Sequence, residues 1–344
     1  MNKCIIHQGV DLHKKFFTFF CLDERTGDSR EGKVYNDDPE GLKRYLNQFD
    51  AASEVAVEAN RNWYWFVDML QERGIDVHLS NPKQTKAIAW ARLKNDKVDA
   101  RMLCHLLKAD LLPTCWIPEK PWRDLREMVR YRMKLVSIRT QLKNMIHSYL
   151  SKQNIHTKFT NIWEGKGRSW LENIRLKYPH EGMKEYCLEL IEHLSEIISK
   201  YDEELKNIGY RPKGIELIET LPYTEYTRAL TIITETGPIE MFKSSKSYVA
   251  CCGLAPTTRS SAGRTKQGRL SKEARLTLKW VYIEIANQVW RVDKDFHKYY
   301  FHVVYKRGKN IAKISLARKL AKAVYHMLKE GITFDEYKRR YLAR

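Results

Sequence analysis

Two aspartates spaced three residues apart, Asp96 and Asp99, stand in the segment KNDKVDA, residues 94–100. The segment is typical of a helix start, where residues i and i+3 share one face, so both carboxylates point the same way. Two acids this close repel each other unless a cation lies between them. Mg²⁺ prefers oxygen ligands and is often bound by one or two carboxylates together with substrate phosphates. A solvated surface turn is the alternative for this segment alone.

Two further acids lie at the ends of predicted strands. Asp11 follows the apolar run 5–10, and Glu58 ends the run EVAVE, residues 54–58. A single acid at a strand end commonly caps the next turn. Two acids on strands that face two acids on a helix form a different arrangement, that of a phosphoryl-transfer site with two metal ions ~3.5–4 Å apart.

A serine pair lies in the basic segment PTTRSSAGRTKQGRLSK, residues 256–272, for which we predict a flexible Ser/Gly loop after a helix that ends at Gly253. Serine hydroxyls in such a loop bind phosphate by hydrogen bonding. A nucleophilic serine needs activation, and no histidine lies nearby in the sequence. Residue types alone therefore favour phosphate binding over nucleophilic attack. The side chains expected to contact a nucleic-acid backbone are Arg259, Ser260, Arg264, Lys266, Arg269 and Lys272.

The positive charge of the chain is concentrated near its C-terminus. Residues 1–115 carry 17 Lys/Arg and 17 Asp/Glu, whereas residues 241–344 carry 24 against 7, a net of +17 out of +19 for the whole chain. A basic block with an ordered hydrophobic pattern favours a polyanionic partner. Nucleic acid is the leading candidate, and an anionic membrane surface is the alternative.

The elements that must position these residues follow from hydrophobic periodicity. Runs at 5–10, 16–22, 33–36, 54–58 and 76–79 predict strands, and 40–49, 62–74 and the segment after Pro82 predict helices, which together indicate a mixed α/β layer. Long helical patterns at 122–149 and 185–205 predict an arm, with a partly ordered connection over 153–178. The two long helices pair either as a coiled coil between subunits or as a hairpin within one subunit.

Three more helices are predicted at 276–292, 296–305 and 311–330. Most of their large aromatic side chains are expected in the core and a minority on nucleic-acid bases. These side chains are Trp280, Trp290, Tyr299, Tyr300 and Tyr305.

Membrane and secretory classes are not expected. No apolar run approaches the ~20 residues that span a bilayer, and the first residues, MNKCIIHQGVD, lack a signal-peptide core. Seven cysteines without a CxxC pair argue against disulfides and a zinc site. We therefore expect a cytoplasmic protein.

The segments GVDLHK (9–14), VEA (57–59) and KNDKVDA (94–100) together resemble the DEDD transposases of bridge-RNA-guided insertion sequences, a group that includes the Piv pilin-gene invertase. The downstream segments GLAP (253–256) and SSAG (260–263) resemble the C-terminal signature of the same family. The resemblance implies an α/β plus α fold with three parts: a RuvC-like RNase H-fold domain at 1–113, a helical coiled-coil arm at 114–208 and a mostly helical transposase domain at 209–344.

On this resemblance, Asp11, Glu58, Asp96 and Asp99 would be ligands of Mg²⁺ or Mn²⁺. Ser261, with Ser260 as the adjacent alternative, would attack a DNA phosphodiester and hold it as a 5′-phosphoserine. The resemblance also implies DNA and a bridge RNA as partners and a homodimer or tetramer. Two rival functions remain: a metal-dependent nuclease or Holliday-junction resolvase that needs the acids but not the serine, and a non-catalytic nucleic-acid-binding protein.

Overall fold

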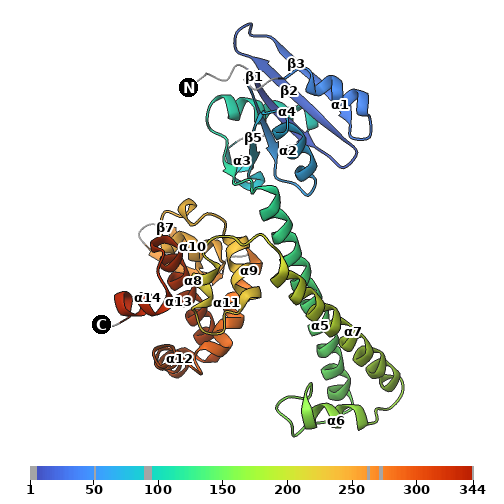
Figure 1. The fold of residues 1–344 in the computed structure, drawn as a ribbon, viewed down its shortest axis with the longest axis vertical. Coiled ribbons are helices and arrows are strands. Elements are labelled where there is room, and N and C mark those ends of the chain that lie inside the picture. Colours follow the sequence, from blue (N-terminus) through green and yellow to red (C-terminus); the bar gives the residue numbers. More distant parts are fainter. Residues whose placement is uncertain (1–5, 50–51, 89–94, 262–263, 271–273, 343–344) are drawn as a thin grey trace. The chain divides into compact units, whose positions relative to one another are not determined.

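The computed structural model describes the chain except for residues 1–5, 50–51, 89–94, 262–263, 271–273 and 343–344, and it describes only the backbone at 258–261 and 264–267. Two compact units divide the chain, Met1–Pro118 and Glu119–Arg344. The first unit contains a mixed sheet and the second is mostly helical (Figure 1). The predicted combination of an α/β part and a helical part is confirmed.

The sheet of the first unit has the strand order β3-β2-β1-β4-β5-β6. Its strands are β1 (Ile6–Leu12), β2 (Phe16–Asp23), β3 (Ser29–Tyr35), β4 (Ser53–Glu58), β5 (Asp76–Ser80) and β6 (Thr114–Cys115). The pairs β1–β4 and β4–β5 are parallel, and the other neighbouring pairs are antiparallel. The two-residue strand β6 was not predicted, since so short a run carries no alternation.

Helices cover both faces of this sheet. They are α1 (Pro39–Leu46), α2 (Trp63–Gln71), α3 (Pro82–Ile88) and α4 (Asp96–Lys108). Val10 and Val57 pack on one face with Phe66 of α2, whereas Ala56 on the other face packs with Leu103 of α4. Because side chains alternate along a strand, Asp11 and Glu58 belong to the face that α4 covers.

Two long helices of the second unit, α5 (Lys120–Lys152) and α7 (His180–Asn207), pack against each other within one chain (Figure 1). This is the hairpin within one subunit, the second of the two arrangements predicted for these helices. The connection between them is not partly ordered as we expected: it contains α6 (Gly165–Asn173), and Ile162, Leu171 and Leu176 are buried in a core shared with both long helices. Aromatic and aliphatic side chains near the glycines supply that core.

The remaining helices pack around one large core. They are α8 (Ile215–Glu219), α9 (Tyr226–Thr236), α10 (Ser245–Cys251), α11 (Leu276–Val289), α12 (Lys294–Arg307), α13 (Lys309–Glu330) and α14 (Phe334–Tyr341), with a 3-10 turn at Ile239–Met241. Helices α9, α11 and α13 supply most of the buried side chains. The unpredicted α14 begins with a capping box, in which Thr333 and Glu336 bond each other's backbone N–H groups.

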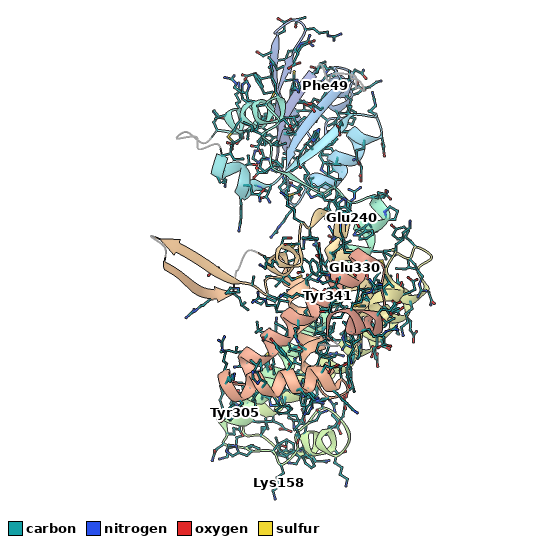
Figure 2. The ribbon with its side chains drawn as sticks, turned by 90° about the vertical axis from the view of Figure 1, so that its left-hand side faces the viewer. Phe49, Lys158, Glu240, Tyr305, Glu330 and Tyr341 are labelled. Carbon is teal, nitrogen blue, oxygen red and sulfur yellow. The ribbon has the colours of Figure 1, made fainter. Side chains whose placement is uncertain are left out.

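The predicted Ser/Gly loop is wrong as a description of the backbone at residues 256–270. This segment is an antiparallel hairpin of β7 (Pro256–Ser261) and β8 (Arg264–Leu270) that extends outward from the helices of the second unit (Figure 2). Its β-branched threonines suit paired strands, although the segment lacks the alternating apolar pattern that would have indicated them. No helix among the described residues has the length and apolarity to span a membrane.

Candidate active site

Neighbouring strand ends place two of the four acids side by side. Strands β1 and β4 are parallel, and Val10 pairs with Val57, so Asp11 and Glu58 are the next residues on the two strands. Both belong to the face covered by α4, because alternate residues of a strand share a face. The strand-end positions predicted for these acids are therefore confirmed.

Helix α4 delivers the other two acids. Asn95 caps the helix by accepting a hydrogen bond from the backbone N–H of Lys97, and Asp96 and Asp99 lie in the first turn. The Thr18 hydroxyl of β2 donates to the backbone oxygen of Asp96 at 3.2 Å, which ties the helix start to the sheet. Acids are favoured at this end of a helix because its free N–H groups carry partial positive charge.

A glycine lets α4 approach the sheet closely. A Cβ atom added to Gly9 of β1 would lie 2.0 Å from the backbone oxygen of Ala100 and 2.5 Å from the backbone nitrogen of Cys104. Any other residue at this position would force the helix away from the strand. The depth at which Asp96 and Asp99 stand over β1 therefore depends on Gly9.

His13 joins the strand acids to the helix acids. Its Nε2 lies 3.1 Å from Oδ2 of Asp11 and 3.4 Å from Oδ2 of Asp96. Its position two residues after Asp11, just beyond the end of β1, brings its ring to the carboxylate. No role was predicted for His13, although the Asp-x-His spacing was present as a signal.

The charges of the four acids act on one another, and we call these residues the acidic cluster (Asp11, Glu58, Asp96 and Asp99). Burial raises the pKa of Asp11 to about 6. His13 acts in the opposite direction, whereas the charges of Asp96, Asp99 and Glu58 raise the pKa of Asp11 further. The electrostatic free energy of the cluster therefore falls when a cation binds.

The donor atoms fit a divalent cation. One ligand atom each from Asp11, His13 and Asp96 can be chosen so that all three lie within 4.8 Å of one another. Carboxylate oxygens are the ligands that Mg²⁺ and Mn²⁺ prefer, and imidazole is acceptable to Mn²⁺. Asp11 is buried while the side chains of His13 and Asp96 are 40% and 46% exposed, so the group is open to a substrate on one side.

Asn60 fixes the end of β4 next to this cluster. Its side-chain nitrogen donates to the backbone oxygen of Leu12, and its side-chain oxygen accepts from the backbone N–H of Asn62 at 2.8 Å. These bonds link the residues that follow Glu58 to the strand that carries Asp11. The amide thereby holds the two acidic strand ends in register.

The predicted serines belong to the second unit. Ser261 is the last residue of β7 and pairs with Arg264, and Ser260 pairs with Thr265. Both therefore stand beside the hairpin turn. Arg259, Arg264 and Lys266 were predicted to contact phosphate, and their side chains are outside the described part of the structure. Lys272 is also outside it, and Arg269 is exposed on β8.

Comparison with known proteins agrees with these observations. A family profile for DEDD-type IS110 transposases matches residues 8–155, and a second, described as Transposase IS116/IS110/IS902 family, matches residues 215–301. The chain is 25% identical to the transposase for insertion sequence element IS1111A of Coxiella burnetii over 95% of this chain and 90% of that protein. It is 21% identical to the transposase for insertion sequence element IS1328 of Yersinia enterocolitica over 95% of this chain and 98% of that protein.

The first profile spans all four members of the acidic cluster, and the second spans the serine hairpin. The two profiles match in the same order along the chain as the N-terminal and C-terminal segments that resembled this family. The chain belongs to the IS110 family of DEDD transposases.

Proposed function

We propose that this transposase breaks and rejoins DNA strands with the acidic cluster of its first unit and Ser261 of its second unit. The observation that carries the proposal is the convergence of β1, β4 and the first turn of α4, which gathers four carboxylates on one face of the sheet. Four carboxylates can hold two divalent ions of the kind that phosphoryl-transfer enzymes use. We infer that the sheet is a RuvC-like RNase H fold and that the domain boundaries lie near residues 113 and 208.

The acidic cluster would hold Mg²⁺ or Mn²⁺, with His13 orienting the carboxylates of Asp11 and Asp96. Bound ions would stabilise negative charge on the reacting phosphate. The Ser261 oxygen attacks phosphorus, so that its bond to phosphorus forms while the bond from phosphorus to the 3′ oxygen breaks. The serine hydroxyl loses its proton and the departing 3′ oxygen gains one. A 3′ hydroxyl of the partner strand then reverses the step.

The remaining parts of the proposal concern partners. Arg259, Ser260, Arg264, Lys266, Arg269 and Lys272 would contact the nucleic-acid backbone around the reacting phosphate. Exchange between two duplexes needs more than one active site, so we propose a dimer or tetramer. A bridge RNA encoded by the element would select the target and donor, and RNA copurifying with the protein, identified by sequencing, would test this directly.

Covalent trapping on cognate junction DNA tests the chemistry. Wild-type protein with Mg²⁺ should yield a protein–DNA adduct that survives denaturation, and Ser261→Ala should yield none. Ser260→Ala serves as the matched control and should retain the adduct. Asp99→Asn should reduce adduct formation by at least ~10²-fold, since it removes a carboxylate from the reacting centre.

The rival functions give different results in the same assay. A nuclease or resolvase would cut DNA in both Ser261→Ala and wild-type protein without forming an adduct. A non-catalytic binding protein would show no cutting in wild type and no effect of Asp99→Asn. An adduct that persists in Ser261→Ala but disappears in Ser260→Ala would move the nucleophile to Ser260.

A further inference from the structure

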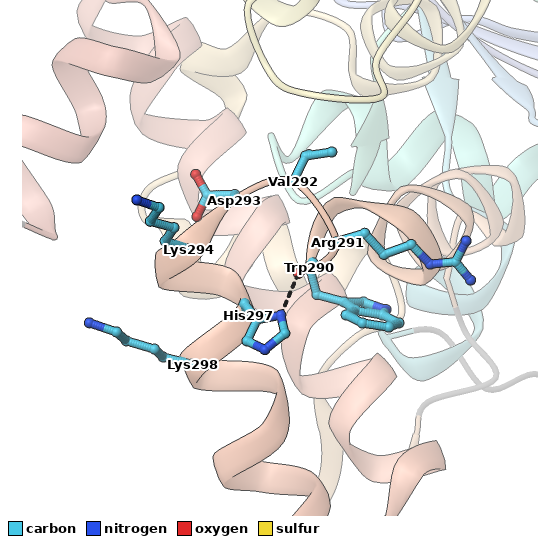
Figure 3. A pocket seen from close by; sticks show the side chains of 7 residues that line it. All are labelled: Trp290, Arg291, Val292, Asp293, Lys294, His297 and Lys298. Carbon is cyan, nitrogen blue, oxygen red and sulfur yellow. Dashed lines mark hydrogen bonds between the residues drawn. The ribbon is translucent and has the colours of Figure 1, made fainter.

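Aromatic rings and cations gather on the exposed side of α12 and on the turn that precedes it, a segment that contains none of the residues used in the proposed function above. We call this surface the α12 face and define it by Trp290, Arg291, Lys294, His297, Lys298 and Phe301. The turn borders an open cavity of about 220 Å³, lined among others by Trp290, Arg291, Asp293, Lys294, His297 and Lys298 (Figure 3). The cavity belongs wholly to the second unit.

The rings of the α12 face are held in place by their neighbours. Trp290 stacks on buried Tyr300 with ring centroids 5.0 Å apart and planes at 6°. Phe301 lies 5.5 Å from Trp290 and 4.7 Å from the ring of His297. The Nδ1 of His297 is 3.1 Å from the Trp290 backbone oxygen (Figure 3). Rings fixed before binding lose little conformational entropy when a planar ligand stacks on them.

The two carboxylates near the α12 face, Asp293 and Asp295, are both paired with Lys338, which is not part of the face. Asp293 is buried, caps α12 by accepting from two backbone N–H groups, and is 2.8 Å from Nζ of Lys338, which also contacts Asp295 at 3.0 Å. By contrast, Arg291, Lys294 and Lys298 have no ion-pair partner among the side chains that the structure describes, and Arg291 lies over the Trp290 ring at 5.3 Å. The local charge is therefore positive.

The same helix continues this pattern to its end. Phe301 is 45% exposed, and Tyr305, which Figure 2 labels, is 92% exposed. The two side chains are one turn apart on α12, about 6 Å along the helix axis. Lys306 and Arg307 follow directly and are exposed. Neighbouring exposed rings, unlike scattered single ones, are typical of an interaction site.

We propose that the α12 face, together with Tyr305, binds unpaired nucleotides of a nucleic-acid strand, with Phe301 and Tyr305 stacking on bases and Arg291, Lys294 and Lys298 contacting phosphates. Duplex DNA offers phosphates but keeps its bases stacked, so exposed rings would gain little from it. A protein partner is disfavoured by the lysines, which are depleted in protein interfaces. Stacking platforms with basic side chains are the common means of holding single strands.

The inference deepens the proposed function by adding a strand-binding site to it, and it can fail independently. Strand exchange exposes unpaired DNA, and a bridge RNA would expose unpaired loops, so DNA and RNA are two sources of the same chemistry. The test measures binding rather than cleavage. Failure of Ser261 to form an adduct would therefore leave this inference standing, and loss of the binding predicted below would leave the adduct result standing.

Fluorescence anisotropy of the full-length protein with labelled single strands provides the measurement. Phe301→Ala combined with Tyr305→Ala should raise the Kd for a mixed-sequence single strand by about 5- to 150-fold for each base that loses its stacking partner. The affinity for a duplex of the same length should change less than twofold. Tyr186→Ala on α7 is the matched control, because Tyr186 is a comparably exposed ring in the same unit.

A second variant tests the cations. Replacing Arg291, Lys294 and Lys298 by glutamine should weaken single-strand binding and reduce the slope of log K against log salt by about 2. Matched DNA and RNA strands form the two arms, and a loss on either strand supports the proposal and identifies its ligand. Unchanged single-strand affinity in the ring variant, or an equal loss for duplex and single strand, would overturn it.

Discussion

At the scale of single residues, the proton affinity of Asp11 connects the stability of the protein to its proposed chemistry. Its carboxyl is buried beside three other acids, and its pKa is raised from 3.8 to about 6. The folded state therefore binds more protons than the unfolded state between these two pH values. Stability is lost as the pH rises through that window, and above it the ionised Asp11 destabilises the fold.

Removal of this charge should stabilise the protein when no metal ion is bound. At pH 7.5 in EDTA, Asp11→Asn should raise the free energy of unfolding of the first unit by up to about 3 kcal/mol, the equivalent of the pKa difference. The gain should disappear below pH 4, where wild-type Asp11 is protonated in both states. Thermal denaturation at several pH values measures it, and exposed Asp37→Asn should show no such gain.

Addition of Mg²⁺ or Mn²⁺ should make the wild-type protein more stable than Asp11→Asn, the reverse of their order in EDTA. A cation bound by the acidic cluster stabilises wild type by mass action and stabilises Asp11→Asn much less. Equal stabilisation of both proteins would place the cation elsewhere.

Residue types alone predicted the acidic cluster but not its histidine. Asp11 and Glu58 were predicted from the apolar runs that end at them, and Asp96 and Asp99 from their i,i+3 spacing. His13 was missed because an Asp-x-His spacing has many meanings until a third group is known to lie nearby. The contact of His13 with Asp96, 83 residues away in the chain, depends on the tertiary structure, so no local sequence pattern predicts it.

At the scale of elements, the site depends on the close packing of α4 on β1. The strand supplies Asp11 and the helix supplies Asp96 and Asp99, and Gly9 allows the two backbones to approach. The carboxylates must meet within the reach of a metal ion, so a small displacement of the helix separates them. Overpacking at Gly9 should therefore disturb the site as well as the stability.

Gly9→Ala should lower the free energy of unfolding of the first unit by about 1–3 kcal/mol, because the added methyl group meets backbone rather than a flexible side chain. It should also weaken stabilisation by Mn²⁺, measured as the shift in thermal midpoint. Gly182→Ala in α7 is the matched control, since its Cβ would have no neighbour closer than 4.0 Å. That variant should be neutral or slightly stabilising. A Gly9→Ala protein with wild-type midpoint and Mn²⁺ response would show that the helix approach is not required.

Elements with a strong period were predicted, and those with a weak one were not. The apolar strands of the sheet and the long helices α5 and α7 follow from alternation and from the 3.6-residue repeat. The hairpin of β7 and β8 carries Thr, Ser, Arg and Lys in place of alternating apolar residues, so it was predicted as a loop. Its strands pair through backbone groups, which the identity of the side chains does not reveal.

At the scale of the whole molecule, the second unit contains an ion pair between distant helices, with its carboxylate buried, that sequence patterns could not anticipate. Arg130 of α5 donates from Nε and Nη2 to Glu235 of α9 at 2.6 and 3.1 Å, and Glu235 is 1% exposed. Arg126 and Trp122 of α5 donate to the backbone oxygen of Thr234 near the end of α9. The long helix thereby satisfies a carbonyl group at a helix C-terminus.

Charge is the other property of the whole chain, and it predicts how the transposase binds DNA. Residues 1–115 are balanced at 17 against 17, whereas residues 241–344 carry a net of +17. Binding through that excess releases counterions from DNA, so affinity falls steeply as salt rises. The acidic cluster should contribute little to this attraction, since its task is local and its own charge repels phosphate.

Duplex binding by the full-length protein in EDTA should therefore weaken by about 10³- to 10⁵-fold between 50 and 200 mM salt if six to ten phosphates are contacted. Asp99→Asn should keep the slope of log K against log salt within about one unit of wild type, because it adds only one positive charge to a balanced region. Electrophoretic mobility shift or anisotropy at four salt concentrations measures both slopes. An affinity that varies less than tenfold over this range would mean that the C-terminal charge is not the DNA-binding surface, whereas a large change of slope in Asp99→Asn would place phosphate contacts at the acidic cluster even without metal.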